Sequence, residues 1–421
     1  MPRPLAPRTA RRLALAALAL VASLGTTTVA AAQGDTTTAM LAARALAAAG
    51  GVRAGETVVV VGGTHTVPYM EAVAAAVTRA GGSALIELTS EVVQRAFVRD
   101  MPVTHLRAAD QAGTGMFAAM LGRADVMIVF PASADPDALN AEFAADTARM
   151  GAMMRAFTAN QIAYDRVRNE SRTRFVNVNF PPTKASVRRS GMDAAGFTQM
   201  MLGAIATDQA ALARTGSAIA RLMERGREMR ITTPAGTDLR VPLLAGRKAA
   251  LNAGVVPAAP AGATTRLAAM RSASLPGGQV SIAPNEAAVN GTVVVPREEC
   301  PDTPVRNARF AVRAGKVTDF TAEEGGKCMT NLIAAGGPQA SGFSYVLIGL
   351  NPALRPNAES GYMPWSGAGI VHIGVGNNKD LGGANGAPTG LGWALLDATV
   401  TIDGTAVVRN GQLVDVATTS R

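Results

Sequence analysis

Histidine and cysteine are scarce in this chain, which has three histidines and two cysteines in 421 residues. The cysteines are isolated and form no CxxC pair, which excludes the usual zinc-binding spacing. The sequence contains no GxSxG, GxxxxGK[ST] or HExxH motif, and its first predicted strand is not followed by GxGxxG. It therefore offers no nucleophile elbow, phosphate-binding loop, zincin helix or dinucleotide fingerprint. Lysine and arginine form no cluster on a predicted helix, which argues against a nucleic-acid partner.

The first 32 residues differ in texture from the rest. Four arginines precede the apolar run LALAALALVASL at 13–24, which is too short to cross a bilayer, and small residues follow it up to Gln33. This pattern predicts a bacterial-type secretory signal over residues 1–32, cleaved near Ala32, and a periplasmic or secreted mature chain without stable membrane insertion. A retained anchor is the alternative. Removing the four arginines lowers the formal net charge from +9 to +5.

The two cysteines fall in the exported part. Cys300 and Cys328 are 28 positions apart, and an even pair in an oxidising compartment is suited to a disulfide. Sequence does not show whether their Cβ atoms meet, so the pairing stays open.

The mature chain is long enough for two domains and has a globular composition, with 48% hydrophobic and 17% charged residues. Strand patterns at 56–63, 83–88, 124–131 and 174–182 are separated by helical stretches, including those at 67–82, 105–121 and 137–162. Strands alternating with helices predict a parallel sheet with crossover helices. We therefore expect an N-terminal α/β sheet domain over residues 33–228.

A single long helix is predicted over 193–226, with Phe197, Met200, Met201 and Ala204 on one face, a stripe typical of core packing. From about 229 the pattern changes to short strands without intervening helices, as in FSYVLIGLNP and GIVHIGVG. This texture indicates a β-rich, mainly antiparallel C-terminal domain over 229–421.

Two histidines lie in the first half. His65 follows the first strand, where open α/β sheets often bind ligands, although a lone loop histidine is more often a surface or capping residue. His105 has weaker surroundings.

Five blocks of the second half resemble a known family. They are ITTPAGTDLRVPLLAGRKAALNAG (231–254), SLPGGQVSIAPNEAAVNGTVVVP (274–296), ASGFSYVLIGLNP (340–352), GIVHIGVGNNKDLGGAN (369–385) and GLGWALLDATVTIDG (390–404). Together they are similar to the thermophilic metallo-aminopeptidase family, which includes leucyl aminopeptidase and the aminopeptidase T and S types. The iron-dependent dihydroxypyridine dioxygenases share that layout. The resemblance runs from about residue 37 to the C-terminus.

The resemblance implies a homodimer whose C-terminal domain binds a divalent metal (Zn, Co, Mn or Fe) for hydrolysis of a peptide. Its ligands would be two Glu, a His, and a His-x-Asp pair. Carried over to this sequence, those positions hold Gln279, Tyr345, His372, Gly392 and Ala394. Only His372 matches, which predicts a degenerate metal site and impaired or lost hydrolysis. A bound divalent metal is expected only if the protein is active, and none otherwise.

Two other interpretations remain. Acids near the blocks, Glu286 and Asp380 above all, could rebuild a site around His372, although acids in turns are usually solvated. Alternatively, the retained glycine and asparagine turns keep the cleft as a non-catalytic pocket for a peptide or small molecule, with Trp365 and Trp393 stacking on the ligand. Burial of both tryptophans in the core or a dimer interface is the simpler expectation.

Overall fold

The structure is a computed structural model, and it describes residues 36–102, 104–105, 119–120, 122–143, 146, 149, 165–166, 168–258, 267–300, 303–388 and 390–416. The predicted secretory signal lies outside these residues, as do most of the predicted helices at 105–121 and 137–162. Within the described part, no helix combines the length and the apolar character needed to span a bilayer.

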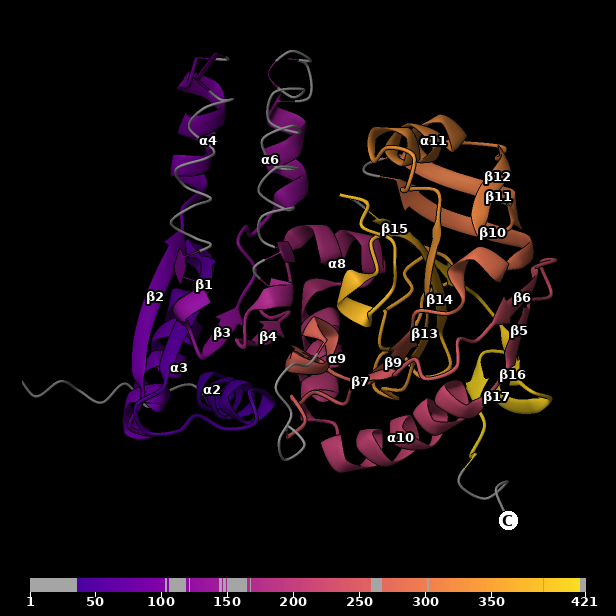
Figure 1. Ribbon diagram of the computed structural model, residues 1–421. Helices are drawn as coiled ribbons and strands as arrows, with labels where there is room; N and C mark the ends of the chain where they lie inside the picture. The colour runs from indigo at the N-terminus through magenta and orange to yellow at the C-terminus, as the bar shows by residue number, and fades with distance from the viewer. Residues whose placement is uncertain are drawn as a thin grey trace, which may run out of the picture.

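A five-stranded parallel sheet forms the first part of the molecule (Figure 1). Its strands, in spatial order, are β2 (Ser83–Thr89), β1 (Thr57–Gly63), β3 (Val126–Val129), β4 (Arg174–Val178) and β8 (Ser272–Leu275). Strand β1, between β2 and β3, contains four consecutive valines and is buried on both faces, as a parallel strand between crossover helices must be. The predicted α/β sheet and its first four strands are confirmed.

Helices connect and cover this sheet. They are α2 (Thr36–Ala48), α3 (Val67–Arg79), α4 (Glu91–Asp100), α6 (Pro136–Phe143), α8 (Lys184–Ser190) and α9 (Ala194–Ala206). Apolar faces of α2, α3 and α9 pack with β1, β3 and β4 into one buried cluster. In Figure 1, α4 and α6 rise side by side away from the sheet, and Arg95 of α4 pairs with Glu142 of α6 at 2.8 Å.

The prediction of a single helix over 193–226 is wrong, because the chain forms α9 and a separate α10 (Gln209–Arg225). Thr207 leaves the helical region with φ −53° and ψ 143°, and the Asp208 side chain then accepts a hydrogen bond from the Ala210 amide as the N-cap of α10. The core role predicted for the Phe197 and Met201 face is confirmed, since both side chains are buried.

Two antiparallel sheets form the β-rich part, which confirms that prediction. The larger has the order β12 (Lys316–Thr321), β11 (Thr303–Arg313), β10 (Asn290–Cys300), β6 (Asp238–Pro242), β5 (Glu228–Thr232), β16 (Thr399–Ile402), β17 (Thr405–Arg409) and β18 (Gln412–Leu413). The smaller has the order β15 (Gly390–Leu395), β14 (Val371–Gly376), β13 (Phe343–Gly349), β9 (Gln279–Ile282) and β7 (Ala250–Asn252). Their inner faces and α10 share one hydrophobic cluster.

The expectation of no helices among these strands is wrong. Helix α11 (Gly326–Ala335) begins directly after Gly325, which has φ 73° and starts the helix from the left-handed region. Cys328 in its first turn forms a disulfide with Cys300 at the end of β10, with the two Cα atoms 6.0 Å apart. The pairing that the sequence left open is therefore made, and it fixes α11 to the larger sheet.

The chain returns once from the second part to the first. Strand β8 lies in sequence beyond the predicted boundary near 228, yet it pairs in parallel with β4, from Phe175 opposite Ser272 to Val178 opposite Leu275. The turn Pro276–Gly277–Gly278 then leads directly from β8 into β9 of the smaller sheet. This connection places the carboxyl end of the parallel sheet beside the smaller sheet.

Candidate functional site

The smaller antiparallel sheet brings most of the sequence-predicted site residues onto one face. His372 lies in β14 opposite Leu347 of β13 and Ala394 of β15, while Gly374 lies opposite Tyr345 and Gly392. Residues two apart on a strand share a face, so Tyr345, His372, Gly392 and Ala394 are neighbours. Gln279 lies on β9 opposite Gly349, two residues beyond Leu347 on the same face.

The imidazole of His372 is enclosed by an aromatic ring. Trp365 stacks on it with ring centroids 4.6 Å apart and an angle of 9° between the planes. One ring nitrogen is hydrogen-bonded to the Pro364 carbonyl, which leaves Nε2 buried without a partner among the described residues. Burial lowers the pKa of His372 to about 4, although the Pro364 bond acts in the opposite direction. The side chain is therefore a neutral imidazole at physiological pH.

Aromatic rings also fill the space over the neighbouring glycines. The Tyr345 ring lies against Gly374 and leaves no room there for a side chain. A Cβ atom at Gly392 would lie 2.5 Å from the Tyr345 hydroxyl and 2.8 Å from Cη2 of Trp365. A histidine at position 392, which the family pattern calls for, would require both rings to move.

The donors on this face do not fit a divalent metal. Gln279 is a neutral amide whose Oε1 accepts a hydrogen bond from the Ser366 hydroxyl at 3.1 Å, and glycine and alanine at 392 and 394 provide no donor. Burial raises the pKa of Tyr345 above its usual value, so its phenol stays protonated. No group of three or more His, Cys, Asp or Glu side chains suited to a metal occurs in the described residues. His372 remains a single nitrogen ligand, and such sites need three or more.

The proposed substitutes lie beyond the ends of these strands. The Glu286 carboxylate accepts hydrogen bonds from Asn378 Nδ2 at 2.8 Å and from the Ala384 amide at 3.0 Å, and Arg247 lies 4.0 Å away. Asp380 lies in the turn after β14, near Tyr345. The structure does not bring both acids to His372 as a three-donor group. Glu286 instead stabilises the loop that follows β14.

A cavity of about 1070 Å³ opens beside this face. One wall is the carboxyl end of the parallel sheet, formed by the residues after β3, β4 and β8, where open α/β sheets bind ligands. The opposite wall is the loop 360–366, including Trp365, together with the end of β10. Trp365 therefore separates His372 from the cavity. One face of the indole is covered by the His372 ring, and Trp365 is nevertheless 48% exposed.

Sequence reasoning missed Glu298, the acid at the end of β10 that lines this cavity. Its carboxylate accepts hydrogen bonds from the Glu299 and Ala394 amides, and Ala394 is the register partner of His372. Burial raises the pKa of Glu298 to about 7 despite these bonds, and the nearby charge of Glu299 adds to the rise. In the sequence, Glu298 is followed by Glu299 and Cys300, and nothing in that pattern distinguishes a buried cavity acid from a solvent-exposed one.

Polar contacts position the loop that carries Trp365. The carbonyl of Ser190, at the end of α8, accepts hydrogen bonds from Asn357 Nδ2 at 2.9 Å and the Ser360 hydroxyl at 3.0 Å. Arg189 of the same helix pairs with Asp137 at 2.7 Å and with Glu299 at 3.2 Å, across the cavity mouth. These contacts join the two parts of the molecule at the cavity.

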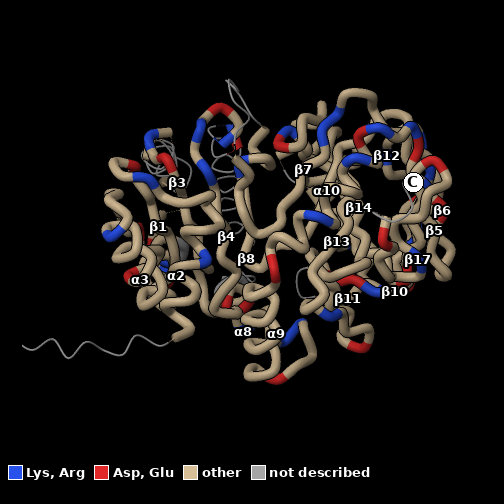
Figure 2. The backbone as a smooth tube through the Cα atoms, turned by 90° about the horizontal axis from the view of Figure 1, so that it is seen from below, with Lys and Arg blue, Asp and Glu red and all other residues tan. Residues whose placement is uncertain are grey.

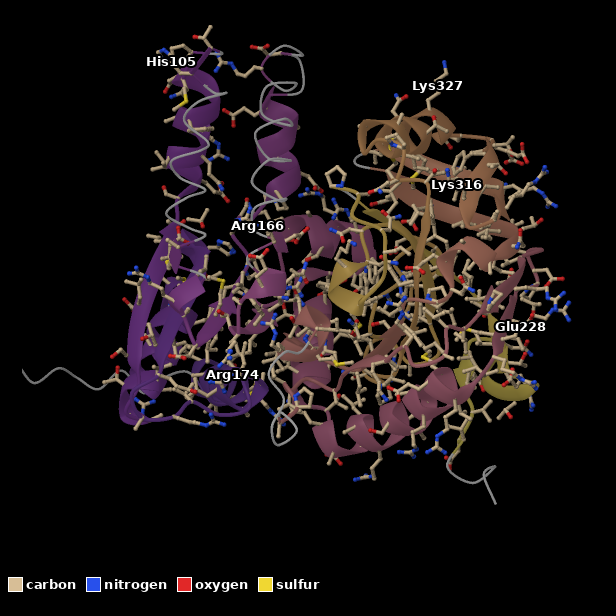
Figure 3. The ribbon with its side chains drawn as sticks, viewed as in Figure 1. His105, Arg166, Arg174, Glu228, Lys316 and Lys327 are labelled. Carbon is tan, nitrogen blue, oxygen red and sulfur yellow. A yellow bond between two sulfur atoms is a disulfide. The ribbon has the colours of Figure 1, made fainter. Side chains whose placement is uncertain are left out.

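The two remaining histidines lie in the first part of the molecule, and the two tryptophans differ in burial. Burial lowers the pKa of His65, and the Glu91 carboxylate near it accepts a 2.6 Å hydrogen bond from Ser133. His105 lies beyond the far end of α4, away from the β-rich part (Figure 3). Trp393 is buried in the core as expected, whereas the half-exposed Trp365 is not.

Basic and acidic residues are interspersed along the described backbone (Figure 2). No curated protein matches the chain by sequence.

The α/β sheet is connected to antiparallel sheets, and the retained histidine lies on the face of the smaller one. This architecture and the family match together place the protein among the aminopeptidase-like metallopeptidases. The chain belongs to the thermophilic metalloprotease (M29) family, whose family model matches residues 35–337. That match ends before β13, so His372, Gly392 and Ala394 lie beyond it.

Two solved structures share the fold. AmpT from Thermus thermophilus is 17% identical with a TM-score of 0.67, and the match covers 90% of this chain and 99% of that one. The 2,5-dihydroxypyridine dioxygenase of Pseudomonas putida KT2440 is 17% identical with a TM-score of 0.56, over 90% and 97% of the two chains. These likenesses establish the architecture and leave the chemistry to this chain's own residues.

Proposed function

We propose that this protein is an exported member of the family that binds a peptide or small molecule in the cavity and has lost metal-dependent peptide hydrolysis. The observation that carries the proposal is the enclosure of His372 under Trp365, with Tyr345 filling the space over Gly392. An active centre of this family requires acidic and histidine ligands around an accessible metal. Here those positions carry an amide, a phenol, a glycine and an alanine.

A defined cavity lies beside these positions. Asn351, in the retained GLNP turn, is fully buried, and its side-chain amide donates to the carbonyls of Ala204 at 3.0 Å and Gly277 at 2.9 Å. This amide holds the end of α9 and the turn before β9 together beside the cavity. A site kept rigid in this way suits ligand binding, because little ordering remains to oppose association.

Metal content and hydrolysis test the proposal together. The chain from Gln33 onward is incubated with Zn²⁺, Co²⁺, Mn²⁺ or Fe²⁺, freed of unbound ion, and assayed for metal and for cleavage of leucine p-nitroanilide. We expect substoichiometric metal and no cleavage above the blank, with His372→Ala giving the same result as the unmodified chain. Stoichiometric metal that supports cleavage and disappears in His372→Ala would sink the proposal in favour of a hydrolase with a rebuilt site.

A variant that restores the family's metal ligands serves as the positive control for the metal-binding experiment. Gln279→Glu, Tyr345→Glu, Gly392→His and Ala394→Asp restore the family's donors, and Trp365→Ala removes the ring that covers His372. If the lost donors are the reason for weak metal binding, this combined variant binds Zn²⁺ far more tightly than the unmodified chain. Equal binding by the two proteins would mean that the donor positions have been assigned wrongly.

A further inference from the structure

The outer face of the Trp365 indole is exposed to the cavity and is held in a fixed orientation. Its inner face is covered by the His372 ring, while the side chain is 48% exposed and lines the cavity. The close approach of Cη2 to Gly392, together with the His372 stack, fixes the plane of the ring. An immobilised, half-exposed tryptophan offers a ligand a flat aromatic face that loses little freedom on binding.

The group beneath the indole determines what its outer face attracts. A protonated imidazole there would oppose a second cation on the other side of the ring. His372 is 3% exposed and its Nε2 has no partner among the described residues, so the neutral form of the ring is favoured there. The negative π-face of Trp365 is therefore available to a cation in the cavity.

A carboxylate lines the same cavity as the Trp365 ring. Glu298 accepts a hydrogen bond from the Ala394 amide, and Ala394 is two residues along β15 from Gly392, which the Trp365 ring overlies. Two residues of a strand span about 7 Å. Among the described residues, Glu298 takes part in no ion pair, whereas Arg189 pairs with both Asp137 and Glu299. Glu298 is thus the cavity acid whose charge is not already compensated.

We propose that the cavity recognises organic cations, with an ammonium group bound between the outer face of Trp365 and the Glu298 carboxylate and an apolar body lying against other aromatic and methionine side chains of the cavity lining. This inference rests on the proposed function, because it names the ligand class of the same cavity. These lining side chains are Phe130 after β3, Phe197 and Met201 of α9, and Tyr362 of the loop that carries Trp365.

Binding depends on the ionisation of Glu298. The charged groups around it are Glu299 on the same strand, Arg189 from α8, Asp137 from α6, and Arg297, which donates to the Glu359 carbonyl. Arg189 is shared by two other acids, so burial dominates and the pKa of Glu298 is raised to about 7. Raising the pH through this value ionises the carboxylate, so cation affinity rises by up to about tenfold from about pH 6 to about pH 8.

The test compares a cation with its neutral isostere. Choline and 3,3-dimethylbutan-1-ol have the same shape and differ in charge, and benzyltrimethylammonium adds an apolar body. Binding to the full mature chain is measured by titration calorimetry and by tryptophan fluorescence, which reports on Trp365 because Trp393 is fully buried. We expect both cations to bind at least about tenfold more tightly than the alcohol.

Two glutamine variants distinguish the proposed carboxylate from its neighbour. Glu298→Gln should weaken binding of both cations about tenfold and remove the pH dependence, while Glu299→Gln changes affinity by no more than about twofold. Circular dichroism confirms folding, and Trp365→Leu checks the aromatic contribution. Equal affinity for choline and the alcohol, no binding of either cation, or equal effects of the two glutamine variants would overturn the inference. Metal-dependent hydrolysis would overturn the proposed function instead and leaves the cation comparison unaffected.

Discussion

Single side chains set the protonation of the retained histidine. His372 is 3% exposed and covered by Trp365, and burial accounts for its low pKa. Trp365→Ala opens the imidazole to water, which stabilises its charged form, so we expect the pKa of His372 to rise from about 4 toward its ordinary value of 6.5. An NMR titration of the histidine ring resonances measures this, with His372→Gln identifying the signal. An unchanged pKa would show that Trp365 is not the covering group.

His372 and Glu298 have opposite effects on stability as the pH changes. The folded pKa of His372 lies below its unfolded value, so its contribution is complete above pH 6.5 and lost as the pH falls toward 4, by about 3 kcal/mol. The folded pKa of Glu298 lies above its unfolded value of 4.5, so its contribution is complete below pH 4.5 and lost as the pH rises through about 7.

Urea unfolding measured from about pH 4 to about pH 7 distinguishes the stability contribution of His372 from that of Glu298. His372→Gln leaves the Glu298 effect, so its free energy of unfolding should fall with pH relative to the unmodified chain. Glu298→Gln leaves the His372 effect, so its free energy of unfolding should rise with pH relative to that chain. Parallel curves for both variants would contradict the assigned pKa shifts.

The positions of the site that lie in the smaller sheet were predictable from the sequence, whereas the groups that reach it from outside this sheet were not. The HIGVG pattern identified His372, and the family blocks led to positions 345, 392 and 394, which lie beside it in the sheet register. Trp365 and Glu298 reach the site from a loop and from the other sheet. Ser360 of that loop and Glu299 beside Glu298 contact α8, which lies more than a hundred residues away in sequence. No local sequence pattern predicts that these two side chains reach the same site as His372.

At the level of helices and turns, Asn351 joins three segments. Its amide donates to two carbonyls, and its Oδ1 accepts from the Thr207 hydroxyl at 3.2 Å and the Ala353 amide at 3.1 Å. Asn351→Ala leaves buried polar groups without partners, so we expect a loss of about 3 kcal/mol in the free energy of unfolding. The exposed Asn331→Ala on α11 is the control and should change it by less than about 0.5 kcal/mol. Similar small losses in both would mean that the amide is not structural.

The disulfide between Cys300 and Cys328 fixes α11 to β10. It closes a loop with a sequence separation of 28, for which chain entropy predicts a stabilisation of about 3–4 kcal/mol. Reductant should therefore lower the unfolding midpoint of the unmodified chain and leave that of Cys300→Ala/Cys328→Ala unchanged. If reductant has no effect on the unmodified chain, the bond contributes nothing to stability.

Helices and strands were predicted correctly where the hydrophobic periodicity of the sequence was strong. The prediction failed where a helix begins at a single capping residue. The four valines of β1 and the alternating second half identify their strands directly. The break between α9 and α10 depends on Asp208 capping a new helix within a continuous apolar pattern, and α11 begins at a single left-handed glycine. Short β7 and β8 become strands through their long-range partners β9 and β4.

For the whole molecule, we propose export and a homodimer. Expression of the full chain in a Gram-negative host should yield a periplasmic product whose N-terminal sequence begins at Gln33, because small residues at 30–32 precede it. Light scattering of this product should give twice the mass of the mature chain. A cytoplasmic product that retains Met1, or a monomeric mass, would contradict the respective proposal.

The return of β8 to the parallel sheet limits how this protein can be dissected. A fragment ending near residue 228 would leave β4 as an open sheet edge, with unpaired backbone groups beside the apolar Phe175, Val176 and Val178. Open apolar edges template pairing with other chains, so such a fragment should aggregate. Circular permutants that keep β4 and β8 in one polypeptide would retain the pairing, which makes this strand pair the unit that protein engineering of the chain must preserve.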